Sequence, residues 1–292
     1  MDHNGQLTCA VCGTGASVTC SVRSSFSHRT FELAQCPKCH YSFVTDPRTD
    51  FAALYDDAYY RGRGADPNVD YERELVDAKT LRVYEWRAIL EIVEHLKGPL
   101  NGIRWLEYGC GLGGLVRFGR QQGIDITGFD AGHAAERMRK EGIPALTPED
   151  LDAASASFDV VTAIEVVEHL VDPMPTLRQI ATLLRPGGLF FLTTGNAQPF
   201  RSRLERWSYV QPDVHVGYFE PATLELAFRK VGLQPSSPGF VPGFTDLIRY
   251  KVLKSLGLKR RHMLERVVPW PLAARVVDRR YDVSAHPVGW RR

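Results

Sequence analysis

From residue 102 to residue 233 the sequence alternates between strand-like and helix-like apolar patterns, and this alternation restricts the fold more than any other feature. Short apolar runs occupy residues 103–107, 124–129, 158–164 and 189–194, and helical spacing follows at 112–122, 133–141, 173–184 and 220–231. Elements that alternate at these lengths predict an α/β fold with a doubly wound, mostly parallel sheet. Ligands of such sheets bind at the carboxyl ends of the strands.

A glycine-rich loop follows the first predicted strand and has the sequence EYGCGLGG (107–114). Its glycines permit a tight turn and a close approach of a ligand to the backbone, just where a helix begins. Asp130 ends the next strand, where a carboxylate can accept both ribose hydroxyls of an adenosine. The negative charge of Glu107 suits an amino group or a sulfonium better than a pyrophosphate. The loop therefore indicates a cofactor that contains adenosine and a positive charge.

Four segments, taken together, resemble successive motifs of the class I S-adenosylmethionine (SAM)-dependent methyltransferases: LEYGCGLGG (106–114), GFD (128–130), FDVVTAIEVVEHLVDP (158–173) and LLRPGGLFFLTT (183–194). The resemblance covers about residues 102–233 and implies a seven-stranded sheet with SAM as the cofactor. It also implies that Glu107 faces the methionine part of SAM and that Asp130 holds the ribose. The remaining cofactor-binding residues expected from it are Gly109, Cys110, Gly111, Gly113, Ile164 and Glu165.

The segment EVVEH (165–169) follows the predicted strand 158–164, where substrate and cofactor meet. It resembles the E-x-x-E-H segment of the ubiquinone-biosynthesis O-methyltransferases and the plant small-RNA 2′-O-methyltransferases. In those enzymes the carboxylates and histidine, with a downstream histidine, bind a divalent metal. His215 is the candidate for the downstream histidine here, and Trp207, Tyr209 and Tyr218 near it form either an aromatic substrate wall or part of the core.

Two catalytic roles remain open for these four residues. Glu165, Glu168, His169 and His215 could hold a second divalent metal, because carboxylates and imidazoles are suitable ligands. Alternatively, one histidine accepts the proton of the methyl acceptor as a general base. We favour the base, with His215 ahead of His169. A purely structural histidine is the third alternative.

Two CxxC pairs, Cys9/Cys12 and Cys36/Cys39, lie 23 residues apart in the first fifty residues. Four thiolates in this arrangement predict a structural Zn²⁺ site in a small zinc-ribbon-like module, because four protein ligands leave the ion no open position. A redox pair or an iron site is the alternative. The arrangement resembles the zinc-binding N-terminus of the deoxysugar C-methyltransferases, and some ribosomal RNA methyltransferases also join a zinc module to this fold.

The predicted organisation has three parts. Residues 1–50 form the zinc-binding module, and residues 51–100 form a connector and an N-terminal helix, within 69–97, that covers the cofactor site. Residues 101–292 form the methyltransferase domain, with a helical basic insertion at about 246–280 and a final strand within 284–290. From residue 246 onward 12 Lys and Arg stand against 4 Asp and Glu, whereas the preceding residues have 24 against 30. Such a bias marks either a surface for an anionic partner or solvated helix faces.

The predicted function is SAM-dependent methylation of a small-molecule acceptor, with an oxygen as the predicted methyl-accepting atom. The acceptor classes are a secondary metabolite, a quinone-like compound or a sugar. The alternatives are an RNA methyltransferase that uses the zinc module and the basic tail, a sugar C-methyltransferase, and a non-catalytic SAM-binding scaffold. No apolar run is long enough to span a bilayer and the N-terminus has no apolar signal-peptide core, so we expect a cytoplasmic protein. A homodimer is left open.

Overall fold

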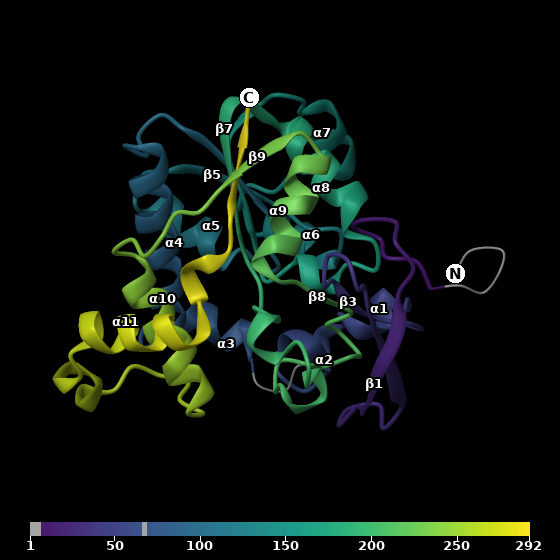
Figure 1. The fold of residues 1–292 in the computed structure, drawn as a ribbon. Helices are drawn as coiled ribbons and strands as arrows, with labels where there is room; N and C mark the ends of the chain where they lie inside the picture. The colour runs from purple at the N-terminus through teal and green to yellow at the C-terminus, as the bar shows by residue number, and fades with distance from the viewer. Residues whose placement is uncertain (1–6, 66–68) are drawn as a thin grey trace.

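The computed structural model describes residues 7–65 and 69–292. Its main sheet has the strand order β5-β4-β6-β7-β10-β9. Strands β4, β5, β6 and β7 run parallel, and β10 is antiparallel to both of its neighbours. The prediction of a doubly wound, mostly parallel sheet is therefore confirmed (Figure 1). The strands are β4 (Arg104–Tyr108), β5 (Asp125–Phe129), β6 (Phe158–Ile164), β7 (Leu184–Thr193), β9 (Leu233–Ser236) and β10 (Val288–Arg291).

Helices cover both faces of this sheet because successive side chains of a strand point to opposite faces. Trp105 packs in a core with α4, α5 and α10, whereas its neighbour Leu106 packs in a second core with α8 and α9. The helices are α1 (Phe51–Leu54), α2 (Asp57–Tyr60), α3 (Tyr71–Val76), α4 (Arg82–Lys97), α5 (Gly114–Gln121), α6 (His133–Lys140), α7 (Pro148–Ala153), α8 (Pro173–Leu183), α9 (Pro221–Lys230), α10 (Phe244–Ser255) and α11 (Trp270–Tyr281). Short 3-10 turns are η1 (Val167–His169), η2 (Gln198–Phe200), η3 (Leu204–Arg206), η4 (Met263–Val267) and η5 (Val283–Ala285).

The described residues form six strands in the main sheet, so the expected count of seven is wrong. At the β5 edge the seventh strand is reduced to a single parallel bridge between Gly128 and Ala145. The Gly128 N–H donates to the Pro144 carbonyl at 3.0 Å, and the Leu146 N–H donates to the Gly128 carbonyl at 2.8 Å. Thr147 then caps α7, so the chain turns into a helix before a second bridge can form.

The apolar periodicity of residues 69–97 predicts one helix, but the structure divides it into α3 and α4. Asp77 has an extended backbone after α3, with φ −79° and ψ 104°. Its carboxylate accepts hydrogen bonds from the Lys79 N–H at 2.9 Å and from the Arg260 guanidinium at 2.6 Å. An aspartate that bonds its own backbone two residues on forms a turn in competition with the helix.

The N-terminal residues form a separate antiparallel sheet of the order β1-β2-β3-β8. Strands β1 (Ser17–Arg23), β2 (Thr30–Gln35) and β3 (Ser42–Val44) are consecutive, but β8 (Gly217–Tyr218) comes from the later chain. Thr223 at the start of α9 also donates to the Cys39 carbonyl at 2.6 Å. The predicted division at residue 50 stays a prediction, and in space the cysteine-bearing segment shares its sheet with the segment that follows His215.

Helices α10 and α11 connect β9 to β10 and form one corner of the molecule, away from β1 (Figure 1). They correspond to the basic helical insertion expected at about 246–280. The final strand expected within residues 284–290 begins later, at Val288, because residues 283–285 form the 3-10 turn η5. Within the described part of the chain, no helix combines the length and apolarity needed to cross a bilayer.

Candidate functional site

A cleft of about 1820 Å³ lies at the carboxyl ends of the parallel strands. Each parallel strand of the main sheet places at least one residue in its wall at or just after its end. The predicted site residues in this wall are Glu107, Gly109, Cys110, Gly111, Asp130, Ile164, Glu165, His169 and His215. Two predicted residues are not in the wall. Gly113 is the N-cap of α5 and packs against Met138, and Glu168 is fully buried behind the wall.

The glycine loop needs its glycines for two different reasons. At Gly109, with φ +74°, a Cβ atom would lie 2.5 Å from the Val166 side chain, so the backbone is closely packed there. At Gly111, with φ +50°, a Cβ atom would have no other atom within 4 Å, so the backbone faces open cleft. A left-handed backbone that is bare toward the cleft suits a ligand that must approach the main chain closely.

Two carboxylates border this loop. Glu107 is 6% exposed, and its Oε2 atom has no hydrogen-bond partner among the described residues. Burial, followed by the charge of Glu85, raises the pKa of Glu107 well above its ordinary value. Asp130 accepts hydrogen bonds from the N–H groups of Gly111 and Gly132, each at 2.9 Å. A buried carboxylate oxygen without a partner calls for a hydrogen-bond donor from a ligand.

Glu165 follows β6 in a left-handed backbone conformation, with φ 53°, which is strained for a residue other than glycine. Its Oε1 accepts from the Lys251 Nζ of α10 at 3.0 Å, and its Oε2 accepts from the Tyr209 hydroxyl at 3.0 Å. Burial would raise the pKa of Glu165, but the Lys251 ammonium lowers it to well below the ordinary value. Glu165 is therefore an ionised carboxylate that the basic insertion neutralises.

Glu168 lies one turn further on, in η1, and its side chain is completely buried. Its Oε2 accepts from the Thr194 hydroxyl at 2.9 Å, and its Oε1 lies within hydrogen-bond distance of the Tyr209 hydroxyl. Burial and the charge of Glu165 raise the pKa of Glu168. The two glutamates consequently differ in charge, because two adjacent buried carboxylates resist ionising together.

His169 and His215 lie edge to face, with ring centroids 4.9 Å apart. The Nδ1 of His169 is 2.9 Å from the Val214 carbonyl, and the Nδ1 of His215 is 2.7 Å from the Tyr209 carbonyl. A carbonyl oxygen only accepts, so each Nδ1 carries a proton and each Nε2 is the basic nitrogen. Burial and the neighbouring His215 lower the pKa of His169 to about 3, so that its imidazole is neutral.

The potential ligand atoms of Glu168, His169 and His215 lie within 4.8 Å of one another. The structure thus brings together three of the four residues expected at a catalytic metal. The carboxylate of Glu165 is not in this group, and Lys251 and Tyr209 bind its two oxygens. The catalytic roles of all four residues stay predictions.

Three further residues of the cleft were not identified from the sequence. Lys251 neutralises Glu165, and Tyr55 places its hydroxyl 2.9 Å from the Nδ1 of His169. His286 donates from Nε2 to the Thr194 carbonyl at 3.1 Å, and its pKa is lowered to about 4, chiefly by burial. Each lies far in sequence from the motifs, and no local pattern distinguishes it. Of the predicted aromatic wall, Trp207 and Tyr209 line the cleft, whereas Tyr218 packs in the core of the N-terminal sheet.

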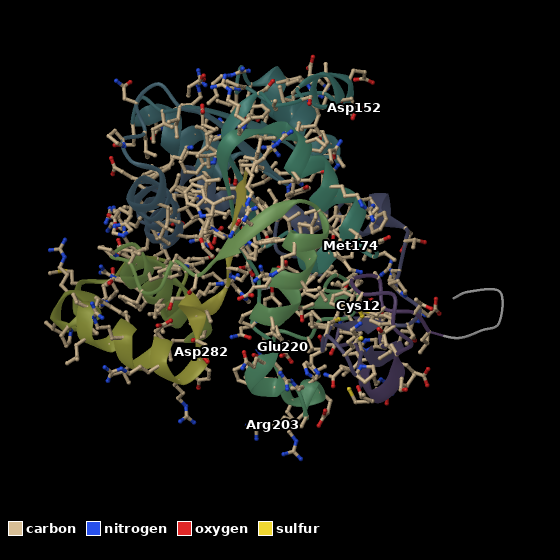
Figure 2. All side chains as sticks on the ribbon, turned by 45° about the horizontal axis from the view of Figure 1, so that its top comes forward. Cys12, Asp152, Met174, Arg203, Glu220 and Asp282 are labelled. Atoms are coloured by element: carbon tan, nitrogen blue, oxygen red, sulfur yellow. The ribbon has the colours of Figure 1, made fainter. Side chains whose placement is uncertain are left out.

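The four cysteines of the two CxxC pairs converge on one point. The Sγ atoms of Cys9 and Cys39 are 3.5 Å apart, and those of Cys12 and Cys36 are 3.3 Å apart. In a tetrahedral zinc site with Zn–S bonds of about 2.3 Å, neighbouring sulfurs lie about 3.8 Å apart. The donor set and spacing therefore fit Zn²⁺, and Figure 2 shows Cys12 on the flank opposite Asp282, at the end of α11.

Comparisons with known proteins find similarity to methyltransferases. The chain is 33% identical over 165 residues to the ubiquinone biosynthesis O-methyltransferase of Bordetella avium (strain 197N), a match that covers 50% of this chain and 68% of the relative. It is 34% identical over 154 residues to the enzyme of the same name from Cereibacter sphaeroides (strain ATCC 17025 / ATH 2.4.3), covering 47% and 62%. A match to the Aeromonas salmonicida (strain A449) enzyme, at 37% identity, covers 38% and 50%. The chain thus spans half to two thirds of the length of these relatives.

Solved structures with a similar fold include a methyltransferase in complex with the Haloferax volcanii Trm112 methyltransferase activator. That similarity has a TM-score of 0.49 and 18% identity, and covers 84% of this chain and 99% of that chain. The magnesium protoporphyrin IX methyltransferase from Synechocystis PCC 6803 gives a TM-score of 0.46 and 16% identity, over 61% and 88%. The family model described as a methyltransferase domain matches residues 80–237, which is more than half of the chain. The chain therefore belongs to the SAM-dependent methyltransferase family.

Proposed function

We propose that this protein methylates a hydroxyl oxygen of a small planar acceptor, with His215 as the base that takes the hydroxyl proton. One observation carries the proposal. The open backbone at Gly111 and the unpartnered Glu107 oxygen lie in the same cleft as the imidazoles of His169 and His215. A cofactor site and a pair of basic nitrogens therefore share one space at the end of the sheet.

SAM, when bound, supplies a methyl group on a sulfonium sulfur. The chain then has two tasks, which are to hold the acceptor oxygen in line with that group and to remove its proton. Glu107, the loop backbone and Asp130 hold the amino acid and ribose parts of the cofactor. A histidine Nε2 accepts the acceptor proton as the oxygen forms its new bond to carbon.

His215 suits the base better than His169. The lowered pKa of His169, about 3, makes its Nε2 a poor proton acceptor near neutral pH. The hydrogen bond from His215 Nδ1 to the Tyr209 carbonyl orients the ring of His215 so that Nε2 is the basic nitrogen. His169 packs edge-on against that ring, which supports a positioning role for His169.

An aromatic stack in the cleft supports a planar acceptor. The Phe200 and Trp207 rings are stacked with centroids 4.9 Å apart, and Trp207 and Tyr209 are stacked at 4.8 Å. All three rings line the cleft. A quinone-like or other aromatic acceptor gains offset stacking on such a wall, and the names of the ubiquinone-biosynthesis relatives agree with this class.

A divalent metal is the second candidate for activation of the hydroxyl. Glu168, His169 and His215 favour it, because their ligand atoms lie within 4.8 Å of one another. A metal there would lower the pKa of a bound hydroxyl and remove the need for a strong base. The pairing of Glu165 with Lys251 counts against a four-residue site, since Lys251 would have to release this carboxylate first.

Activity assays with a panel of phenolic acceptors, sugars and RNA test both the acceptor class and the catalyst. With a histidine base, His215→Ala loses most activity, while Glu168→Gln and a mild chelator have little effect as long as zinc is retained. With a metal, the chelator abolishes activity, magnesium or another divalent ion restores it, and Glu168→Gln is as damaging as His215→Ala. Methylation of RNA or sugar carbon in place of phenolic oxygen would overturn the proposed acceptor class.

The cysteine cluster is proposed to hold one structural Zn²⁺. The four thiolates leave no open coordination position, so the ion takes no part in the reaction. Cys9 and Cys39 share a hydrogen bond that lowers the pKa of the Cys9 thiol and raises the pKa of the Cys39 thiol, and zinc binds cysteine as the thiolate. Such an ion would join the turn at residues 9–12, which precedes β1, to the turn at residues 36–39, which connects β2 and β3.

A further inference from the structure

Exposed apolar side chains are concentrated in the insertion between β9 and β10. Thirteen large apolar side chains are exposed among the described residues, and eight of them lie within residues 256–281. Met263, Val267 and Leu256 are 77%, 80% and 70% exposed, which is unusual for side chains of this kind. We call this set the insertion patch: Leu256, Leu258, Met263, Val267, Val268, Leu272, Val276 and Tyr281.

Helix α11 shows how the patch is built. Its inner face buries Trp270 and Ala274, which lie four residues apart and therefore on one side of the helix. Leu272 and Val276, also four residues apart, point outward and are 64% and 59% exposed. The exposed arginines of α11 flank this outer stripe, and they are Arg275, Arg279 and Arg280. An outward apolar stripe between basic residues is the pattern of a helix that lies in a membrane interface.

The charge of the same segment is one-sided. Seven basic side chains within residues 256–281 are exposed: Lys259, Arg260, Arg261, Arg266, Arg275, Arg279 and Arg280. Arg260 is paired with Asp77, which precedes α4, and the two acidic residues of the segment do not offset the other six at the surface. Glu265 is buried and accepts from Tyr84, and Asp278 accepts from the backbone and hydroxyl of Ser284. The segment thus offers apolar side chains and positive charge together.

We propose that the insertion patch docks the protein on an anionic lipid surface. An anionic lipid surface explains both the apolar and the basic side chains of the segment. The aliphatic side chains would insert among the acyl chains, and the arginines would pair with the anionic headgroups. Single-stranded RNA would use the charge, but it binds by stacking on aromatic rings, and the patch is aliphatic apart from Tyr281. A second copy of the chain is disfavoured, since a two-fold contact would bring the seven cations against one another.

The patch is continuous with the cleft. Leu258, Lys259, Val277 and Tyr281 of the insertion also line the cleft wall, so the docked face borders the cleft opening. Docking therefore brings that opening to the lipid surface, from which an apolar aromatic acceptor could enter. This last consequence rests on the proposed function, whereas the docking itself does not.

Co-sedimentation of the full chain with vesicles tests the docking. We expect binding to vesicles of phosphatidylcholine mixed with phosphatidylglycerol, weaker binding at high salt, and little binding to phosphatidylcholine alone. Arg266→Gln with Arg279→Gln should weaken binding by about fivefold for each arginine removed. Leu272→Ser with Val276→Ser should weaken it by about tenfold through loss of apolar insertion.

Matched controls change the same chemistry elsewhere. Val18→Ser with Phe26→Ser removes exposed apolar groups from the N-terminal sheet and its hairpin, and Arg178→Gln with Lys230→Gln removes two charges from α8 and α9. Both control pairs should bind vesicles as the parent does. Circular dichroism and SAM affinity should be unchanged in all variants, since every substituted side chain is exposed and outside the cofactor site. These readouts are independent of methyl-transfer activity, so the docking can fail while the proposed function stands.

Three outcomes would overturn the docking. The first is no binding to anionic vesicles at low salt, and the second is equal loss of binding in the control pairs. The third is a concentration-dependent dimer, or tight binding of an RNA probe, that the patch variants abolish while vesicle binding is absent.

Discussion

At the scale of single residues, the pairing of Glu165 with Lys251 decides the charge of the active-site wall. The two partners are only partly screened from solvent, with side-chain exposures of 27% and 34%. Lys251→Met should leave an uncompensated carboxylate at a strained backbone position and lower the free energy of unfolding by about 1–2 kcal/mol. That is less than the 3–5 kcal/mol typical of a fully buried pair.

A denaturant-unfolding cycle measures this coupling. Adding Glu165→Gln to Lys251→Met should recover most of the lost stability, because the unpaired charge is then gone. Lys230→Met, on the exposed end of α9, serves as the control and should be neutral. If the double variant is no more stable than Lys251→Met, the unpaired charge of Glu165 is not the cause of the lost stability.

His286 makes stability depend on pH in the acid range. Burial lowers its pKa to about 4. Between pH 6.5 and pH 4, His286 therefore binds a proton in the unfolded chain and stays neutral in the folded chain. The stability that this group contributes is present above pH 6.5 and is lost as the pH falls, with a slope of about 1.4 kcal/mol per pH unit. His286→Gln should make this slope shallower by about one proton, as urea titrations at several pH values would show.

The matched variant His95→Gln changes an exposed histidine of α4 and should leave the slope as it is. A slope that is the same in parent and His286→Gln would mean that His286 is protonated in the folded protein. His169, with a pKa of about 3, contributes to the same acid range, so the variant should reduce the slope and not abolish it.

The place in the cleft of the residues proposed to hold the cofactor could be predicted from the sequence, because each lies in a local motif. Glu107, the glycines and Asp130 are separated from their strands by no more than a few residues, so local geometry places them. Lys251 and His286 could not be found in this way. Their positions depend on how α10 and β10 pack on the sheet. Lys251 is one of twelve basic residues from residue 246 onward, and nothing in the local sequence indicates that it pairs with Glu165.

At the scale of elements, the β3–β8 pairing depends on a close contact with a glycine. A Cβ atom at Gly217 would lie 2.5 Å from the Tyr41 hydroxyl, and Tyr41 is 1% exposed. Gly217→Ala should therefore separate β8 from β3 and lower the free energy of unfolding by about 1–3 kcal/mol, the usual cost of overpacking. Thermal unfolding would measure the loss.

Tyr41→Phe is the matched partner for this test. The Tyr41 hydroxyl is buried without a hydrogen-bond partner among the described residues, so its removal alone should be neutral or mildly stabilising. In combination with Gly217→Ala it should restore part of the loss, because the nearest remaining ring atom is 3.2 Å away. Two independent, additive effects would show that the hydroxyl is not the obstacle.

Strands β4, β5 and β6 could be predicted to within a residue because buried parallel strands are continuous apolar runs, whereas β7 begins five residues before its predicted start and β9 was not predicted. Phe158–Ile164 is an example in which the predicted and observed ends coincide. The N-terminal sheet gave no such signal, since β8 is two residues long and its partner β3 lies more than 170 residues earlier. The break between α3 and α4 was also missed, because the Asp77 turn depends on Arg260 as well as on local bonds.

At the scale of the whole molecule, the cysteine cluster is mechanically connected to the loop that carries His215. The Ser24 hydroxyl donates to Asp213, and the Val44 N–H donates to the Val216 carbonyl at 2.9 Å, so the N-terminal sheet holds both ends of the His215 segment. The cofactor loop lies between β4 and α5 of the main sheet, and the N–H groups of Gly109 and Cys110 donate to the Phe129 carbonyl of β5 at 2.7 and 3.0 Å. Loss of the metal should consequently affect the acceptor side of the cleft more than the cofactor side.

Cys36→Ser tests this asymmetry, and Cys20→Ser, outside the cluster, is its control. The Cys36 variant should lose most of its zinc and melt at a lower temperature, because metal binding and local folding are linked. Its kcat should fall at least tenfold, while the SAM affinity stays within about twofold, because His215 is displaced and the glycine loop is not. Elemental analysis, calorimetry with SAM and steady-state kinetics give the three readouts. Zinc-free protein with an unchanged kcat would show that the N-terminal sheet does not position His215, and equal losses of kcat and SAM affinity would indicate general unfolding.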